Sequence, residues 1–121
     1  MKLKFLFPPV FLVMLIAVFF PARPVHANAA PRRIEVTAKR FEFTPGEITL
    51  KKGEPVVIVL KSLDVTHGLS FRDFGFNVKA SKGQTSEAAF TPTKTGDFVG
   101  QCSVFCGPGH GHMKLTLHVV E

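Results

Sequence analysis

Residues 113–120 read Met113-Lys-Leu-Thr-Leu-His-Val-Val120, and apolar and polar side chains alternate along the first seven of them. The apolar side chains fall on every second residue, at Met113, Leu115, Leu117 and Val119. Side chains two residues apart lie on the same face of a β-strand. The stretch therefore predicts a strand with one buried face and one wet face.

The chain before this stretch shows further short strands separated by turn residues. Residues 56–60 (VVIVL) form a β-branched run that predicts a strand buried on both faces. Shorter apolar patterns predict strands over residues 34–43, 48–50, 88–91 and 98–102, with a bulge where the alternation slips between Ala38 and Phe41. Residues 72–84 predict a long crossover loop. Many short strands between Gly- and Pro-containing turns indicate an all-β sandwich or barrel.

Composition limits the possible classes of protein. The chain has 121 residues, of which 45% are hydrophobic and 20% charged, as in a single globular domain. It carries no Gly-rich dinucleotide or P-loop motif. The net charge is +6, but no basic run exceeds two residues, so we expect no nucleic-acid partner.

The first 27 residues have the organisation of a secretory signal peptide. A short basic start is followed by an uninterrupted apolar run over residues 5–20, and Val25 and Ala27 suit cleavage before Asn28. The run is shorter than the roughly 20 residues of a membrane span, so an uncleaved anchor is the second choice. We expect residues 1–27 to be a leader and residues 28–121 to be one domain in the periplasm or another extracytoplasmic space. A membrane partner is expected only if the leader is retained.

The residues able to carry chemistry gather in one loop. The segment 100–113 (GQCSVFCGPGHGHM) holds both cysteines of the chain, Cys102 and Cys106, together with His110, His112 and Met113. Its glycines and its proline disfavour a regular helix, so it predicts a tight loop between two strands. Thiolate, imidazole and thioether groups together are soft ligands that favour copper.

Three other interpretations of this loop remain open. The cysteines could form a disulfide, although so short a loop gains little stability from one. The site could bind zinc, which has no use for the thioether of Met113. Met113 could also serve only as the first core residue of its strand.

The remaining histidines differ in how well they are placed to act as ligands. His67 follows the buried run 56–60, which places it at a strand end on a sandwich. His118 lies on the polar side of the last strand, and His112 is expected at the exposed rim of the loop. His67 is thus the candidate ligand from outside the loop.

The spacing of these residues resembles a known family. The pattern Cys102-x3-Cys106-x3-His110-x2-Met113, with Asp64-Val-x-His67 upstream, is similar to the dinuclear CuA domain of cytochrome c oxidase subunit II and to the similar domain of nitrous oxide reductase. The resemblance covers about residues 34–121.

The resemblance implies a fold and a set of ligands. It implies a Greek-key cupredoxin sandwich in which Cys102 and Cys106 bridge two copper ions. His67 and His110 would each bind one copper, Met113 would be a weak ligand of one, and the backbone carbonyl of Val104 a weak ligand of the other. The implied protein is an electron carrier rather than an enzyme, with redox partners such as a c-type cytochrome or a terminal oxidase.

The chain also departs from the oxidase pattern. Val104 replaces the usual glutamate between the cysteines, tryptophan is missing, and one short leader replaces a two-helix anchor. We therefore expect a small stand-alone carrier or accessory protein. The alternatives are a mononuclear blue-copper carrier with Cys102 idle, and a copper delivery or storage protein for oxidase assembly.

Overall fold

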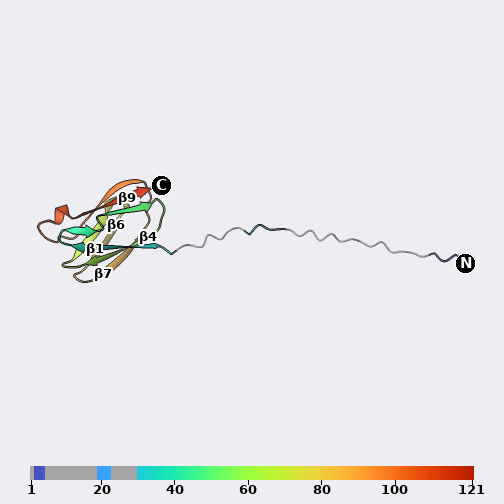
Figure 1. Cartoon of the computed structure of the whole chain (residues 1–121), viewed down its shortest axis with the longest axis horizontal. Coiled ribbons are helices and arrows are strands. Elements are labelled where there is room, and N and C mark those ends of the chain that lie inside the picture. The colour runs from blue at the N-terminus through green and yellow to red at the C-terminus, as the bar shows by residue number, and fades with distance from the viewer. Residues whose placement is uncertain (1, 5–18, 23–29) are drawn as a thin grey trace.

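The computed structural model describes residues 2–4, 19–22 and 30–121. Residues 30–121 form a sandwich of two β-sheets (Figure 1). The strands are β1 (Arg32–Lys39), β2 (Glu42–Thr44), β3 (Glu47–Lys51), β4 (Val56–Ser62), β5 (His67–Phe71), β6 (Phe76–Ala80), β7 (Thr85–Phe90), β8 (Gly96–Gln101) and β9 (Lys114–Val120). Two short 3-10 helices, η1 (Arg72–Phe74) and η2 (His110–His112), complete the described elements. The prediction of an all-β sandwich is confirmed.

The predicted leader lies mostly outside the described residues. The structure leaves out residues 1, 5–18 and 23–29, which hold most of the apolar run and the expected cleavage site. Within the described residues, no helix has the length and apolar character needed to cross a membrane.

The chain passes repeatedly from one sheet to the other, so strands that are neighbours in a sheet are often not consecutive in the sequence. The four-stranded sheet has the order β2-β1-β4-β7, and the five-stranded sheet has the order β3-β9-β8-β5-β6. Two pairs are parallel, β1 with β4 and β3 with β9, and both join strands far apart in the sequence. The remaining pairs are antiparallel. Because β9 lies between β3 and β8, the stretch that predicts the fold is an interior strand of its sheet.

The core lies between the sheets and follows the predicted patterns. On β9, Leu115, Leu117 and Val119 are buried, whereas Lys114 and Val120 are exposed. On β4, four of the five residues of the run 56–60 are buried and Val57 is half-buried. Burial of these aliphatic side chains is the main favourable contribution to folding.

Two local predictions were wrong. The slip between Ala38 and Phe41 is a chain reversal instead of a bulge, because β1 and β2 pair as an antiparallel hairpin with Ala38 opposite Phe43. Residues 72–84 are also no simple crossover loop. They contain η1 and β6, whose Phe76, Val78 and Ala80 are buried.

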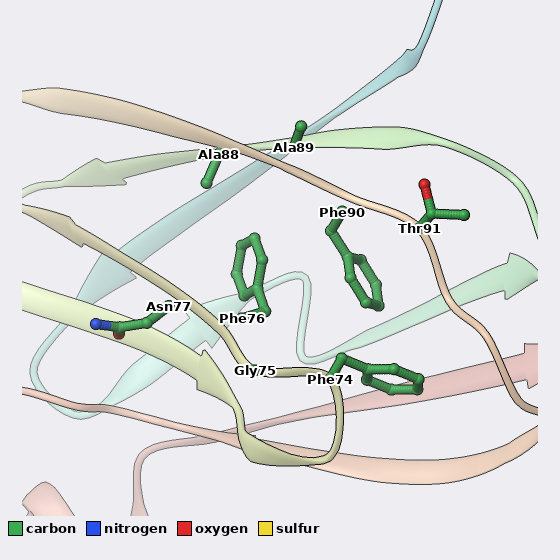
Figure 2. Close-up of a pocket in the computed structure, with 8 residues that line it drawn as sticks. All are labelled: Phe74, Gly75, Phe76, Asn77, Ala88, Ala89, Phe90 and Thr91. Atoms are coloured by element: carbon green, nitrogen blue, oxygen red, sulfur yellow. The ribbon is translucent and has the colours of Figure 1, made fainter.

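A cavity of about 310 Å³ lies beside β6 and β7. Figure 2 shows the rings of Phe74, Phe76 and Phe90 gathered at it, and the ring centroids of Phe74 and Phe90 are 5.0 Å apart. Lys94 lies over the ring of Phe74, with Nζ 5.6 Å from its centroid. None of the predicted metal ligands lines this cavity.

Strands β5 and β8 pack so closely that only glycine fits at position 100. A Cβ atom on Gly100 would lie 2.6 Å from the Phe71 ring and 2.9 Å from Leu69. Both neighbours are fully buried, so the clash cannot be relieved by moving into solvent. Gly100 lies one residue before the end of β8 and two residues before Cys102.

Gly100→Ala is therefore expected to lower the free energy of unfolding by about 1–3 kcal/mol, as overpacking of a dense core does. Denaturant unfolding of the metal-free protein measures this loss. Gly46→Ala is the matched control, because the nearest atom to its added Cβ is the Phe43 carbonyl oxygen at 3.9 Å. Equal stability of the two variants would contradict the packing argument.

Candidate metal centre

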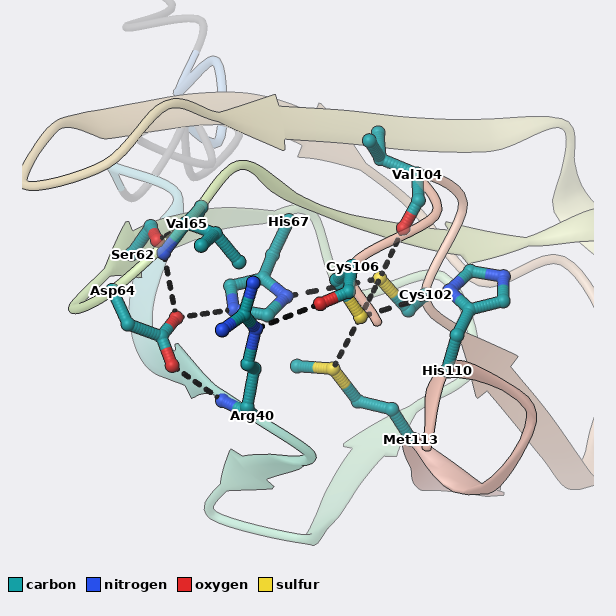
Figure 3. Close-up of polar contacts among 10 residues, drawn as sticks. All are labelled: Arg40, Ser62, Asp64, Val65, His67, Cys102, Val104, Cys106, His110 and Met113. Carbon is teal, nitrogen blue, oxygen red and sulfur yellow. Dashed lines mark hydrogen bonds and ion pairs between the residues drawn. The ribbon is translucent and has the colours of Figure 1, made fainter. Parts of the chain in front are cut away.

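The predicted ligands come together at one end of the sandwich, although they lie on separate segments (Figure 3). His67 is the first residue of β5, and the cysteines lie in the loop between β8 and β9. His110 begins η2, and Met113 directly precedes β9. The side chains of His67, Cys102, Cys106 and Met113 are buried, and His110 is half-buried.

Cys106 is the centre of this group. Its Sγ lies 3.7 Å from Cys102 Sγ, 3.7 Å from His110 Nδ1 and 3.8 Å from Met113 Sδ. The two cysteines are free, since their sulfur atoms are much farther apart than the roughly 2.05 Å of a disulfide. Three sulfur atoms and a ring nitrogen thus face one small space.

Cys102 faces the other half of the group. Its Sγ lies 3.9 Å from His67 Nδ1 and 3.1 Å from the carbonyl oxygen of Val104. One ligand atom each from His67, Cys102 and Cys106 lie within 4.8 Å of one another, a spacing that can hold a metal ion. The structure thus brings all six predicted site residues together: His67, Cys102, Val104, Cys106, His110 and Met113.

Asp64 fixes the orientation of the His67 ring. Its Oδ1 lies 2.6 Å from His67 Nε2, so the ring donates its Nε2–H to the carboxylate. This tautomer leaves the lone pair of Nδ1 directed at the cysteine sulfurs. Sequence analysis noted Asp64 only as part of a motif; its place three residues before His67 was the available signal.

Arg40 joins the two ligand-bearing segments. Its backbone N–H donates to Asp64 Oδ2 at 2.7 Å, and its side-chain Nε–H donates to the Cys106 carbonyl oxygen at 2.8 Å. The hairpin between β1 and β2 therefore holds both the His67 partner and the cysteine loop. No local sequence motif connects Arg40 to Cys106, which lies 66 positions away, so the sequence alone does not indicate this role.

The glycines of the loop allow the neighbouring Phe41 to pack closely. A Cβ atom on Gly109 would lie 2.4 Å from the Phe41 ring, and Gly107 has a φ of 136°, which side-chain-bearing residues rarely adopt. The loop thus lies against the half-buried Phe41 ring. Its conformation is defined by packing as well as by hydrogen bonds.

Burial and proximity keep the thiol of Cys106 protonated in the metal-free protein. Desolvation, followed by the hydrogen bond with Cys102, raises the pKa of Cys106 to about 11. Thiols bind metals as thiolates, so binding at neutral pH must release protons. Metal binding therefore requires the loss of the proton that burial keeps on Cys106.

The two other histidines among the described residues, His112 and His118, stay outside the group, as expected. His112 is exposed in η2. His118 lies on β9 with its Nδ1 2.6 Å from Asp97 Oδ1, and that hydrogen bond raises the pKa of the imidazole.

The ionised carboxylate of Asp64 is expected to make the stability of the protein depend on pH in the acidic range. Partial desolvation opposes its ionisation, but hydrogen bonds from the Arg40 N–H, His67 and the Val65 N–H outweigh it and lower its pKa to about 2. A lowered pKa contributes stability that is present above the unfolded-state value of 3.8 and is lost as the pH falls through about 2. Asp64→Asn should therefore destabilise the metal-free protein at pH 6 and matter little near pH 2.

Denaturant unfolding at the two pH values checks this expectation. Asp73→Asn is the control, because Asp73 is exposed in η1 and has no ion pair among the described residues. A loss of stability at pH 6 that persists at pH 2 would show that the aspartate acts by its shape instead of its charge.

The donor set fits copper. Two thiols, two imidazoles, one thioether and one carbonyl oxygen lie within reach of one another, and soft sulfur and imidazole donors favour copper over hard cations. The thioether of Met113 also has no purpose in a zinc site.

Comparison with known families and curated proteins also supports a copper-binding fold. A family model described as a cupredoxin-like domain matches residues 11–115. Over 90 residues the chain is 29% identical to a probable cytochrome c oxidase subunit 2 of Rickettsia prowazekii (strain Madrid E). That match covers 74% of this chain and 29% of the relative, so the chain spans under a third of the curated relative's length.

Solved structures share the fold. The periplasmic domain of subunit II of cytochrome oxidase of Bradyrhizobium japonicum superposes with a TM-score of 0.69 and 25% identity, covering 77% of this chain and 86% of that one. Auracyanin A, a "blue" copper protein of Chloroflexus aurantiacus, superposes with a TM-score of 0.60 over 75% of this chain and all of that one. At 22% identity, the second likeness concerns the fold alone.

Proposed function

Because the chain belongs to the cupredoxin-like domain family, we propose that it is a copper-binding electron-transfer protein with a dinuclear CuA-type centre, similar to cytochrome c oxidase subunit II. The observation that carries the proposal is the position of the second cysteine. Cys102 Sγ faces His67, Val104 and Cys106 together. A mononuclear site would leave this buried thiol without a role.

Each residue has a proposed role at the centre. Cys102 and Cys106 would hold the copper ions through their sulfurs, His67 and His110 would each bind copper through Nδ1, and Met113 and the Val104 carbonyl would act as weak ligands. When bound, such a copper pair would supply a centre that takes one electron from a donor and gives one electron to an acceptor. The chain's own contribution is to keep the ligands fixed and to exclude water, which limits rearrangement on electron transfer.

The ligands are held in place before metal binds, which supports this role. Asp64 orients His67, Arg40 holds the Cys106 carbonyl, and the surrounding side chains are buried. In this proposal all six residues at the centre act as metal ligands, so we propose an electron carrier instead of an enzyme. Its relatives are subunits of oxidases, and membership of such a complex is compatible with the role.

We place the protein outside the cytoplasm, as for the periplasmic oxidase domain that it resembles. In this proposal residues 1–27 direct export and residues 28–121 form the functional domain. Intact-mass analysis of the exported protein tests the cleavage, which should remove Met1–Ala27. A retained Met1 in the membrane fraction would indicate an anchored domain.

Redox partners such as a c-type cytochrome or a terminal oxidase are proposed to meet the protein briefly at the loop. Phe105 is 78% exposed, and its ring centroid lies 5.6 Å from that of His110. This aromatic side chain gives a partner an apolar contact directly above a proposed ligand. Redox encounters commonly bury less than about 1,200 Å². Recovery in a stable, stoichiometric oxidase complex would contradict a brief encounter.

Copper loading tests the central proposal. We expect two copper ions per chain and a paramagnetic resonance spectrum of one electron shared over both. One copper with a localised electron would instead support the blue-copper alternative. Transfer of copper to a metal-free oxidase without redox turnover would support a delivery role.

The two weak ligands should respond differently to mutation. Val104→Ala keeps the backbone carbonyl, so copper content should stay at two ions and the spectrum should shift little. Met113→Leu removes a sulfur atom while conserving volume, so the reduction potential should change more. Voltammetry and absorption spectra of both variants check this, and loss of copper in Val104→Ala would overturn the backbone-only role of that residue.

A further inference from the structure

A polar cavity of about 220 Å³ opens beside the metal centre. Its lining residues are Ser70, Arg72, Gln101, Cys102, Ser103 and His110. One wall thus consists of two proposed copper ligands, and the rest consists of hydroxyl and amide groups and one guanidinium. A cavity with this lining suits a small negatively charged group.

Two lysines lie on strands β9 and β6 of the same sheet, on either side of the pair β8 and β5. Lys114 pairs with Gln101, and Lys79 pairs with Gly68, whose carbonyl oxygen accepts a hydrogen bond from the Ser103 N–H at 3.2 Å. Both lysines are exposed and alternate with buried neighbours, so their side chains lie on the outer face of the five-stranded sheet.

Acidic side chains do not neutralise these cations. Within residues 30–121, Arg72, Lys79 and Lys114 have no ion pair, whereas other acidic residues are paired elsewhere, such as Glu54 with Arg32 and Glu87 with Arg33. Asp64 is occupied by His67, and Asp73 does not line the cavity. Two acidic residues of the five-stranded sheet, Glu47 and Asp97, contact His118. The end of the sheet next to the proposed ligands therefore carries cations without an ion-pair partner among the described residues.

We propose that this face is the docking site for an acidic redox partner protein, with one of its carboxylates entering the cavity against Arg72. The inference rests on the proposed electron-transfer function. Lys114 and Lys79 lie on β9 and β6, three strand spacings apart, which is about 14 Å. That span exceeds a single small anion and matches several acidic side chains on a protein surface. Docking there brings the partner to His110.

A titration of the copper-loaded protein with a poly-glutamate peptide tests the site. Nuclear magnetic resonance shifts in the diamagnetic, reduced protein should concentrate at Arg72, Gln101, Ser103 and Lys114. Inorganic phosphate and phosphatidylglycerol vesicles are tested in parallel. Equal binding of phosphate would reduce the site to a small-anion pocket, and binding of vesicles instead of peptide would indicate a membrane surface; either result overturns the proposal.

Charge-reversal variants make the test specific. Arg72→Glu should weaken peptide binding about tenfold, as expected for loss of a charged hydrogen bond. Lys79→Glu and Lys114→Glu should each weaken it less. Lys51→Glu is the matched control, because Lys51 is exposed and pairs with Val120, at the other end of β9 from Lys114. Equal effects of Lys51→Glu and Lys114→Glu would overturn the proposal.

The design separates this inference from the proposed function. Copper content and the spectrum are measured for each variant, and the lysine variants keep the test valid if Arg72→Glu disturbs the centre. The titration can also be repeated on the metal-free chain. Binding of the peptide at this face by a chain that binds no copper would contradict the proposed function alone. Binding of two copper ions by a chain that does not bind the peptide would contradict this inference alone.

Discussion

Replacing Cys106 with serine is expected to abolish the copper centre. Cys106 Sγ lies within 3.8 Å of Cys102 Sγ, His110 Nδ1 and Met113 Sδ. Its loss therefore removes the one sulfur atom that contacts all three of these groups. A serine hydroxyl is a hard, weakly acidic donor and does not replace a thiolate for copper. Copper content should fall from two ions per chain to one or none, and the spectrum of the shared electron should disappear.

Cys102→Ser distinguishes the dinuclear from the mononuclear site. If both thiolates bridge, this variant should lose the shared-electron spectrum as completely as Cys106→Ser does. An intact spectrum would show that Cys102 is idle. Ser103→Ala is the control, because its hydroxyl donates to Asn77 Oδ1 at 2.7 Å and takes no part in the sulfur group.

His67→Ala is expected to have the next largest effect, although His67 lies 35 residues before Cys102. The variant removes a fully buried imidazole and leaves Asp64 without its ring partner. Copper affinity should fall by at least about 10–100-fold, the loss seen even when only an outer partner of a metal ligand is removed. Competition with a copper chelator measures this change.

His112→Ala gives a matched comparison for His67→Ala. His112 is close in sequence to His110 and Met113 but is exposed, so its loss should leave the copper affinity unchanged. If both variants bind copper as the unmodified protein does, His67 is an ordinary core histidine. If both variants lose copper, the exposed His112 is also needed for copper binding, which contradicts the proposed ligand set.

The sequence predicted the fold where the pattern was long and regular. The alternation after Met113 and the apolar run 56–60 became β9 and β4, because core burial decides which face of a strand points inward. Strand β6 was not predicted because its short alternation of apolar residues directly follows η1 and a turn at Gly75 with a φ of 62°. The hairpin at Arg40-Phe41 was read as a bulge because neither residue is typical of a turn.

The residues of the site likewise divide into those that a local sequence pattern predicts and those that only the fold reveals. The cysteines, His110 and Met113 lie within 12 residues, so a local motif was enough to group them. Arg40 could not be found in this way. One of its two bonds uses a backbone N–H and the other ends on a backbone carbonyl, groups that every residue except proline offers. Only the folded arrangement of β1, β2 and the loop shows this connection.

The position of β9 between β3 and β8 also determines how early in synthesis the five-stranded sheet can form. A nascent chain that stops before β9 leaves both neighbours with an unpaired edge, and it lacks Met113. Pairing of such distant segments is slow, because the intervening chain must be ordered first. The five-stranded sheet can therefore form only once β9 is available, so the group of ligands that includes Met113 is expected to be completed late, after the whole sandwich has been synthesised.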